Sequence, residues 1–237
     1  MTSALLILTG ARIWTMKDGT PHPTGYWVRE FMEAYQVFTE AGYDVDVTTP
    51  GGVSAEPDPL SWDFGYNNND QDFIDRQRAF LKTIDEVLSK PVKLEDVRPG
   101  QYDILFVVGG HGPMQDLAVH PTIGDLFAAN LDDPSKVVAG VCHGPASFLS
   151  AHRTDGSWLF KGRQLTGFTN VEETMASFAG NAPWLLEDRL RLAGAQFEAA
   201  EAYTVHVVVD GNLITGQQNV SSGAAAAKVV ERIKSQT

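Results

Sequence analysis

The chain has a single cysteine, and its apolar runs are too short to cross a membrane. One cysteine cannot form an intramolecular disulfide, and residues 1–8 lack the basic segment and the long apolar stretch of a signal peptide. The run at residues 104–108 has the length of a buried strand, far short of the roughly 20 residues that a bilayer-spanning helix needs. We therefore expect a cytoplasmic protein with no membrane partner.

Basic side chains are also scarce. The sequence holds 18 Lys and Arg against 30 Asp and Glu, a formal net charge of −12, which repels phosphate backbones and so argues against a nucleic-acid partner. The glycine-rich segments match neither a GxxxxGK[ST] pattern nor a GxGxxG run with a downstream ribose-binding acid, and no HxxxH or CxxC metal spacing occurs. We therefore expect neither a cofactor nor a metal.

Short apolar runs alternate along the chain with helical patterns. The runs are continuous enough for strands buried on both faces, and they lie at residues 4–8, 43–48, 104–108 and 137–141. Helices are predicted at residues 27–41, 70–88 and 123–130, from about 144, at 184–193, and from about 222. The alternation predicts a doubly wound α/β fold, with a mostly parallel sheet and helices on both faces. Because no repeat or flexible linker occurs, we expect one domain over residues 1–237.

Two segments depart from this alternation. Residues 205–209 and 213–215 flank Asp210-Gly211-Asn212, and the Asp-Gly step predicts a β-hairpin. Residues 50–69 form a loop that is longer than loops in compact domains usually are, and it is rich in Pro and Asn. Such a loop is either functional or mobile, and the sequence leaves that choice open.

The cysteine directly follows a predicted strand. Cys142 comes after VVAGV, and Gly144-Pro145 begins the next predicted helix, where a proline in the first turn costs no hydrogen bond. In a doubly wound sheet, ligands bind at the carboxyl ends of the strands. We expect the helix N-terminus to lower the pKa of the thiol, with His143 as a base or an orienting group. The alternative is a small buried hydrophobe beside a hydrogen-bonded histidine.

A glycine-rich loop follows another predicted strand. Gly109, Gly110 and Gly112 surround His111. A backbone of this kind can approach a ligand closely and present its N–H groups. The loop is therefore a candidate oxyanion hole for chemistry at Cys142.

Glu30 lies on the apolar side of the helix predicted at residues 27–41. At 100° per residue it falls within the stripe formed by Trp27, Phe31, Ala34, Phe38 and Ala41. A carboxyl group that faces the core is costly unless it is hydrogen-bonded or protonated, and in a cleft that cost usually accompanies function. The alternative is a side chain at the edge of the stripe that reaches back to solvent.

A series of sequence blocks resembles the DJ-1/PfpI superfamily, and within it the Hsp31-like branch of glutathione-independent glyoxalases and stress chaperones. The blocks follow one another along nearly the whole chain: TGYWVREF, EAGYDVDVTTPGG, PDPLS, GGHGPMQDL, VCHGPASFL, LTGFTNVEET, LLEDRLRLAGAQFE and HVVVDGNLITGQQNVSS. The resemblance implies a flavodoxin-like fold and a homodimer.

The resemblance also implies roles for individual residues. It makes Cys142 the nucleophile, His143 the triad histidine, and Glu30 a protonated acid that hydrogen-bonds the thiolate. The backbone N–H groups of Gly110 and His143 would form the oxyanion hole, and His111 would lie with them at the substrate.

The third triad member is less clear from the sequence. Glu172 and Glu173 are adjacent, and only one of them can face His143. An ungapped match of the TGFTN block to the family places the acid at Glu173.

The implied reaction converts a 2-oxoaldehyde such as methylglyoxal to a 2-hydroxy acid such as D-lactate, so the expected partner is a small carbonyl substrate. Residues 12–22 and 217–220 depart from the family pattern. That departure leaves open another electrophile, as in a hydratase, an amidase or a biosynthetic hydrolase, and a stress chaperone or redox sensor also stays open. Glutaminase activity is disfavoured, because those enzymes carry a late histidine two residues before a glutamate and none of the six histidines has that spacing.

Overall fold

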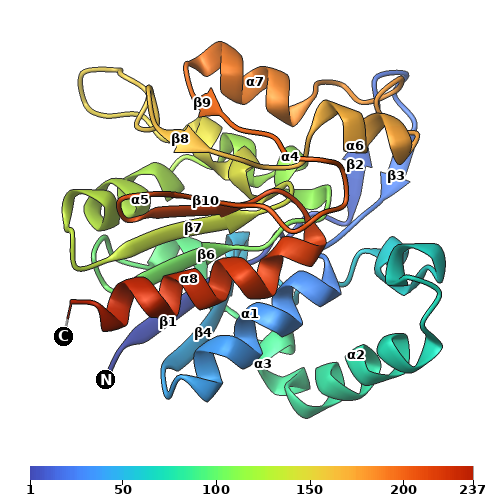
Figure 1. Cartoon of the computed structure of the whole chain (residues 1–237), viewed down its shortest axis with the longest axis horizontal. Helices are drawn as coiled ribbons and strands as arrows, with labels where there is room; N and C mark the ends of the chain where they lie inside the picture. Colours follow the sequence, from blue (N-terminus) through green and yellow to red (C-terminus); the bar gives the residue numbers. More distant parts are fainter. Residues whose placement is uncertain (237) are drawn as a thin grey trace.

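A seven-stranded sheet forms the centre of the computed structural model, which describes residues 1–236 (Figure 1). Its strand order is β10-β11-β7-β6-β1-β4-β5, and every neighbouring pair is parallel except β10 and β11. The strands are β1 (Ser3–Ile7), β4 (Asp44–Thr49), β5 (Val92–Lys93), β6 (Ile104–Val107), β7 (Val137–Val141), β10 (Val207–Asp210) and β11 (Leu213–Gly216). This topology confirms the predicted α/β fold with a mostly parallel sheet.

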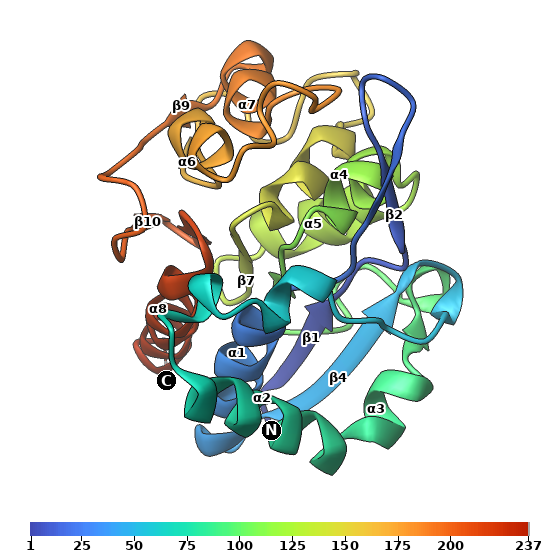
Figure 2. The same ribbon diagram turned by 90° about the vertical axis from the view of Figure 1, so that its right-hand side faces the viewer.

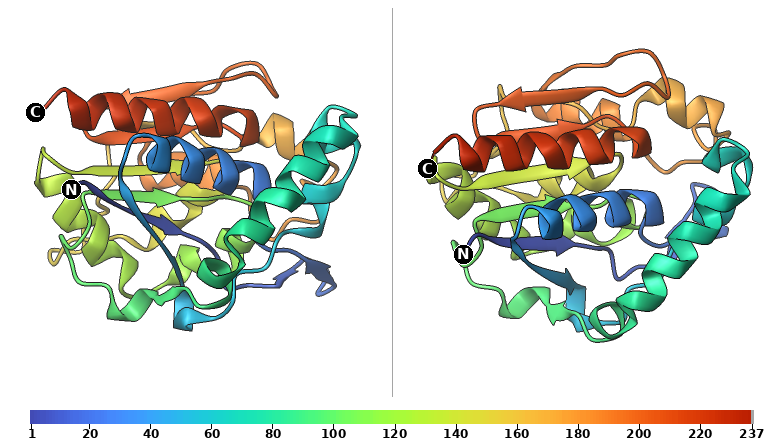
Figure 3. Two further views of the ribbon diagram at one scale, coloured as in Figure 1. Left: turned by 90° about the horizontal axis from the view of Figure 1, so that it is seen from below. Right: turned by 60° about the horizontal axis from the view of Figure 1, so that its bottom comes forward.

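Helices cover both faces of the sheet. On one face, α1 (Val28–Glu40) and α8 (Ser222–Lys234) lie side by side, as both views of Figure 3 show. The other face carries α4 (Gly112–Gln115), α5 (Ile123–Asp132) and α7 (Leu186–Ala193), with α6 (Asn170–Met175) above its edge (Figure 2). The helix α2 (Gln71–Thr83) packs against α1, whereas α3 (Asp85–Ser89) lies beside β4 (Figure 2).

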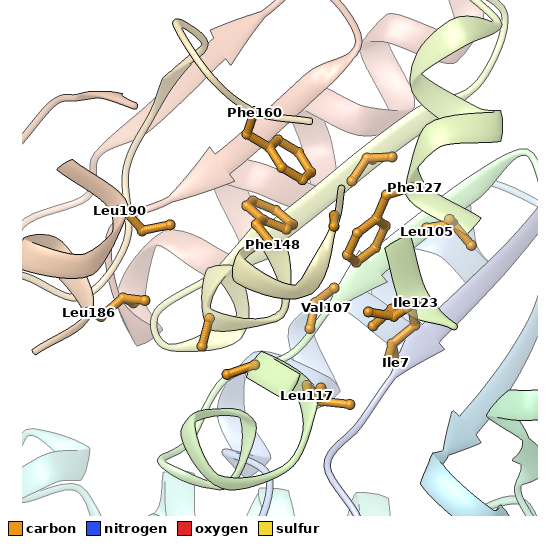
Figure 4. Close-up of a cluster of buried hydrophobic side chains, with 14 of the residues drawn as sticks. Ile7, Leu105, Val107, Leu117, Ile123, Phe127, Phe148, Phe160, Leu186 and Leu190 are labelled. Atoms are coloured by element: carbon orange, nitrogen blue, oxygen red, sulfur yellow. The ribbon is translucent and has the colours of Figure 1, made fainter. Parts of the chain in front are cut away.

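Successive side chains of a strand point to opposite faces of the sheet, so each strand contributes to two separate parts of the core, one on each face. Ala4 and Leu6 pack with the α1 and α8 side chains, whereas Leu5 and Ile7 pack with those of α5 and α7. Figure 4 shows the second layer, in which the rings of Phe148 and Phe160 stack at 4.2 Å between centroids. Burying an aromatic side chain of this size stabilises the fold by about 1.5–3 kcal/mol.

The predicted strands and the helices at residues 27–41, 123–130, 184–193 and 222 onward are confirmed within a few residues. Two helix predictions are corrected. The helix expected over residues 70–88 is two helices, broken at Ile84 with φ −126°. The segment that begins at Gly144 is a 3-10 helix, Gly144–Ser150, because the hydroxyls of Ser147 and Ser150 donate to carbonyls three residues earlier and compete with α-helical bonds.

The remaining elements are short. The predicted hairpin is confirmed as β10 and β11, with Gly211 at φ 62° in its turn. A second hairpin, β2 (Ile13–Thr15) with β3 (Pro21–Pro23), was not predicted and projects beside α4 (Figure 2). The two-residue strands β8 (Gln164–Leu165) and β9 (Gln196–Phe197) pair in parallel near α7.

The loop at residues 50–69 consists largely of short 3-10 turns held by polar side chains. The side-chain amide of Asn67 donates to the carbonyls of Ser61 and Asp63, and the hydroxyl of Ser61 accepts the N–H of Val28 at the start of α1. The loop is thereby fixed across the N-terminal end of α1, close to the carboxyl end of β1 (Figure 2).

The predicted single domain ends at Thr237, which lies outside the described residues, and its extent stays a prediction. Within residues 1–236, none of the helices combines the length and the apolar character that crossing a bilayer requires.

Candidate active site

Cys142 occupies a strained turn at the carboxyl end of β7. Its φ of 57° lies in the left-handed region, which costs a non-glycine residue about 1–3 kcal/mol. Two hydrogen bonds hold this backbone: the N–H of Cys142 donates to the carbonyl of Gly216 at 3.0 Å, and the N–H of Phe168 donates to the Cys142 carbonyl at 2.9 Å. A sharp strand-to-helix turn of this kind presents a nucleophile at the top of a sheet.

The glycine loop after β6 packs directly against this turn. A Cβ atom at Gly109 would lie 2.8 Å from the Cβ of Cys142, and one at Gly110, where φ is 91°, would overlap the carbonyl oxygen of Gly25. This close approach brings the backbone N–H of Gly110, together with that of His143, to the thiol of Cys142, whose pKa both groups lower. The two predicted oxyanion donors therefore lie at the thiol.

Glu30 reaches the same sulfur from the first turn of α1. Its side chain is fully buried, so the alternative that it returns to solvent is wrong. Oε2 accepts the N–H of Gly109 at 2.7 Å, while Oε1 has no hydrogen-bond partner among the described residues. Burial raises the pKa of Glu30 to about 8, against weaker opposite effects of the Gly109 N–H and of Cys142. Glu30 is therefore mostly protonated at neutral pH.

The thiol itself is a weaker acid than the sequence suggests. Burial raises the pKa of Cys142 well above its ordinary value, and the Glu30 carboxyl group, once ionised, raises it further, against the N–H groups of Gly110 and His143. The expectation of a lowered pKa is wrong in its net direction, because Cys142 is 5% exposed and the helix after it is a short 3-10 segment. Below about pH 8 Glu30 keeps its proton, so its charge does not oppose the thiolate there.

A buried carboxylate joins two histidines beside the thiol. Oε2 of Glu173 lies 2.7 Å from Nε2 of His143, and Oε1 lies 2.8 Å from Nε2 of His111. Burial alone would raise the pKa of Glu173, but the charge of His143 and hydrogen bonds from both imidazoles hold it well below its usual range. An ionised carboxylate can only accept, so both histidines carry their proton on Nε2.

This tautomer determines what His143 can do. Its Nδ1 is left without a proton and lies 3.5 Å from Sγ of Cys142, where it can act as a base. Burial lowers the pKa of His143, against the opposing effect of Glu173, so the imidazole is neutral at neutral pH. Cys142, His143 and Glu173 thus form one hydrogen-bonded series.

Glu172 points away from the histidines. Its Oε2 accepts the N–H and the hydroxyl of Thr169 in a capping box at the start of α6, and its Oε1 accepts the N–H of Tyr203 and the amide of Gln217. Of the two adjacent acids that the sequence offers, Glu173 is therefore the one that faces His143.

The thiol opens into a narrow cavity of about 30 Å³, roughly the volume of one water molecule. Leu60 and Tyr66 of the 50–69 loop line it, and the remaining lining residues are Trp27, Gly110, His111, Cys142, His143, Phe168, Ala176, Phe178, Tyr203 and Asn219. The loop thus contributes directly to the pocket. Tyr203 and the two phenylalanines were not predicted, because nothing in their local sequence marks them as lining a site.

The unpredicted β2–β3 hairpin packs against His111. Trp14 is 1% exposed and stacks on His111 at 4.5 Å between ring centroids with an interplanar angle of 11°. His22 meets the edge of the same imidazole at 6.0 Å. Trp14 and His22 of this hairpin therefore contact the His111 ring from two directions.

Side-chain donor atoms of His111, His143 and Glu173 lie within 4.8 Å of one another, and two histidines with a glutamate form a set that zinc accepts in other proteins. Both imidazole Nε2 atoms already donate to the carboxylate. These hydrogen bonds account for the arrangement without an ion.

Known proteins resemble this chain over nearly its whole length. The profile of the DJ-1/PfpI family matches residues 25–232. The chain is 30% identical to the glutathione-independent glyoxalase Hsp31 of Saccharomyces cerevisiae, over 97% of each chain, and 28% identical to glyoxalase 3 of Candida albicans, over 97% of this chain and 98% of that one. The crystal structure of the 24 kDa rapid encystment protein of Francisella tularensis has the same fold, with a TM-score of 0.83, 24% identity, and coverage of 98% of this chain and 99% of that one. The chain therefore belongs to the DJ-1/PfpI family.

Proposed function

We propose that this protein is a glutathione-independent glyoxalase that converts methylglyoxal and water to D-lactate with Cys142 as its nucleophile. The observation that carries the proposal is the series Cys142–His143–Glu173, with two backbone N–H groups at the sulfur and a protonated acid beside it. The glyoxalase names of two full-length relatives support it.

The first step is addition of the Cys142 thiolate to the aldehyde carbon. His143 Nδ1, at 3.5 Å, accepts the thiol proton, and the ionised Glu173 stabilises the imidazolium that forms. The aldehyde oxygen becomes an alkoxide and accepts the N–H groups of Gly110 and His143, which face the sulfur. Glu30 keeps its proton and can donate it to a charge at the sulfur.

The second step moves a proton between the two carbonyl carbons. His143 Nδ1 first returns the thiol proton to the alkoxide, which gives a neutral hemithioacetal. The freed Nδ1 then removes the proton from the former aldehyde carbon and delivers it to the neighbouring carbon through an enediol, which leaves a thioester. Water then hydrolyses the thioester, releasing lactate and the thiol. The aldehyde carbon is oxidised to a carboxyl group while the ketone is reduced to an alcohol, so no external oxidant is needed.

The direct test is D-lactate formation from methylglyoxal in the absence of glutathione. We expect turnover by the wild type and a loss of about three orders of magnitude or more in Cys142→Ser, with nitriles and amides turned over poorly in parallel. No lactate from the wild type, or equal turnover by Cys142→Ser, would reject the proposal. The homodimer and the cytoplasmic location remain proposals that accompany it.

A further inference from the structure

The cavity at Cys142 is too small for a substrate larger than a few atoms. Its volume of about 30 Å³ holds little more than the reacting carbonyl group. Any further part of a substrate must therefore extend past the rim of this inner cavity.

A second cavity adjoins that rim. It has a volume of about 460 Å³, within the range of small-molecule sites, and it shares Tyr66, Tyr203 and Asn219 with the inner cavity. The rest of its lining comes from Asp63, Gly65, Asn68, Met175 and Val220. The small cavity at Cys142 and the larger outer cavity therefore lie next to each other, with these three residues at their boundary.

The rim is held by buried polar groups. Tyr203 adopts a φ of 59°, and its N–H donates to Oε1 of the fully buried Glu172 at 3.0 Å. Gln217 donates to the same oxygen at 3.0 Å, and its own side-chain oxygen accepts the N–H of Ala200 at 2.7 Å. These bonds hold the backbone of Tyr203 at the boundary between the two cavities.

The chemistry of the outer cavity selects among possible substituents. Amide and phenol groups, which both donate and accept, come from Asn68, Asn219 and the two tyrosines, and the eight described residues that line the cavity include no Lys or Arg. A phosphate or carboxylate substituent would find no cation there. The single carboxylate, Asp63, already accepts the N–H groups of Gly65 and Tyr66 through Oδ1. Groups that donate and accept suit a neutral chain of hydroxyl groups.

We infer that the outer cavity binds the hydroxylated chain of a sugar-derived 2-oxoaldehyde, while the oxoaldehyde end reacts at Cys142. This inference rests on the proposed function and specifies its substrate class. With 3-deoxyglucosone as the substrate, the same balanced reaction adds one water and yields 2,4,5,6-tetrahydroxyhexanoic acid.

The test compares kcat/KM for 3-deoxyglucosone and for methylglyoxal, each followed by formation of its hydroxy acid. The variant Asn68→Gly removes an amide from the outer cavity and suits the local φ of 57°. The matched control is Asn69→Gly, at φ 58°, which does not line the cavity. We expect the wild type to favour 3-deoxyglucosone, and Asn68→Gly to lower that preference about fivefold with little change for methylglyoxal.

The outcomes separate the two proposals. Turnover of methylglyoxal with weaker turnover of 3-deoxyglucosone, or equal effects of Asn68→Gly and Asn69→Gly, would overturn the substrate class and leave the glyoxalase proposal intact. Turnover of neither compound would overturn both.

Discussion

Replacement of Glu30 by glutamine tests the electrostatics of the site through protein stability. Glutamine has nearly the same shape, and its amide oxygen can still accept the N–H of Gly109, which Glu30 accepts at 2.7 Å. The substitution removes the titration and keeps the packing. Any pH dependence that it abolishes therefore belongs to the buried carboxyl group.

The magnitude follows from the raised pKa. The pKa of Glu30 changes from an ordinary value of 4.5 to about 8 in the folded protein because the carboxyl group is fully buried. Between these values the folded state binds more protons than the unfolded state, so stability falls as pH rises. Linkage gives a loss of about 4 kcal/mol between pH 5 and pH 9 from this one group.

The assay is urea unfolding of the wild type and Glu30→Gln at a series of pH values. The difference between the free energies of unfolding, Glu30→Gln minus wild type, should rise by about 4 kcal/mol from pH 5 to pH 9. Glu40→Gln, an exposed position on the same helix, is the control, and its difference from the wild type should stay constant. If the Glu30→Gln difference were equally flat, the claim of a buried, protonated acid would be refuted.

Five further substitutions, in three tests, examine other parts of the site. Glu173→Gln should lower kcat/KM for methylglyoxal about a thousandfold or more, because an amide has one oxygen and cannot accept a hydrogen bond at both of the positions that the two imidazoles use. Glu172→Gln should chiefly lower the free energy of unfolding in urea, by about 1–3 kcal/mol. Equal loss of activity in both variants would contradict this division of roles. Gly110→Ala should lower kcat/KM about 100-fold by displacing the oxyanion loop. Gly180→Ala is the control, because a Cβ there meets open space, and it should leave kcat/KM unchanged. A fully active Gly110→Ala protein would refute the close approach of the loop to the carbonyl of Gly25. Trp14→Ala should cost about 3–5 kcal/mol of stability in urea unfolding, and a cost below 1 kcal/mol would contradict its stacking in the core.

Local patterns in the sequence predicted much of the fold because the sheet is buried on both faces. The run at residues 137–141 is apolar at every position, and it forms a strand between two others. The stripe on α1 placed Glu30 inward because helical periodicity alone determines that side. The position of Cys142 at a strand end follows from the Gly-Pro step after it.

The pairing of the acids depends on contacts that local patterns do not contain. Glu172 and Glu173 are neighbours in sequence, and the hydrogen bonds of Thr169 and Tyr203 turn the first one away from His143. His111 meets Glu173 from 62 positions away. The family match named the correct acid, but no periodicity could have done so.

The pKa of Cys142 is the clearest case in which sequence reasoning failed. A helix N-terminus is one interaction that favours the thiolate, whereas the burial of the thiol and the acid beside it both oppose ionisation. The desolvation of the thiol depends on all the residues that surround it, including the loop at residues 109–112. These residues are distant in sequence, so the residues adjacent to Cys142 do not reveal how strongly the thiol is desolvated.

The central claim is that Cys142 forms a covalent bond to the substrate carbon. Mass spectrometry of acid-quenched protein during turnover of methylglyoxal tests it most directly. The account predicts a lactoyl group on the peptide that contains Cys142, present during turnover, lost after the substrate is consumed, and absent in Cys142→Ala. Lactate formation by Cys142→Ala at the wild-type rate, or turnover without any adduct on that peptide, would contradict it.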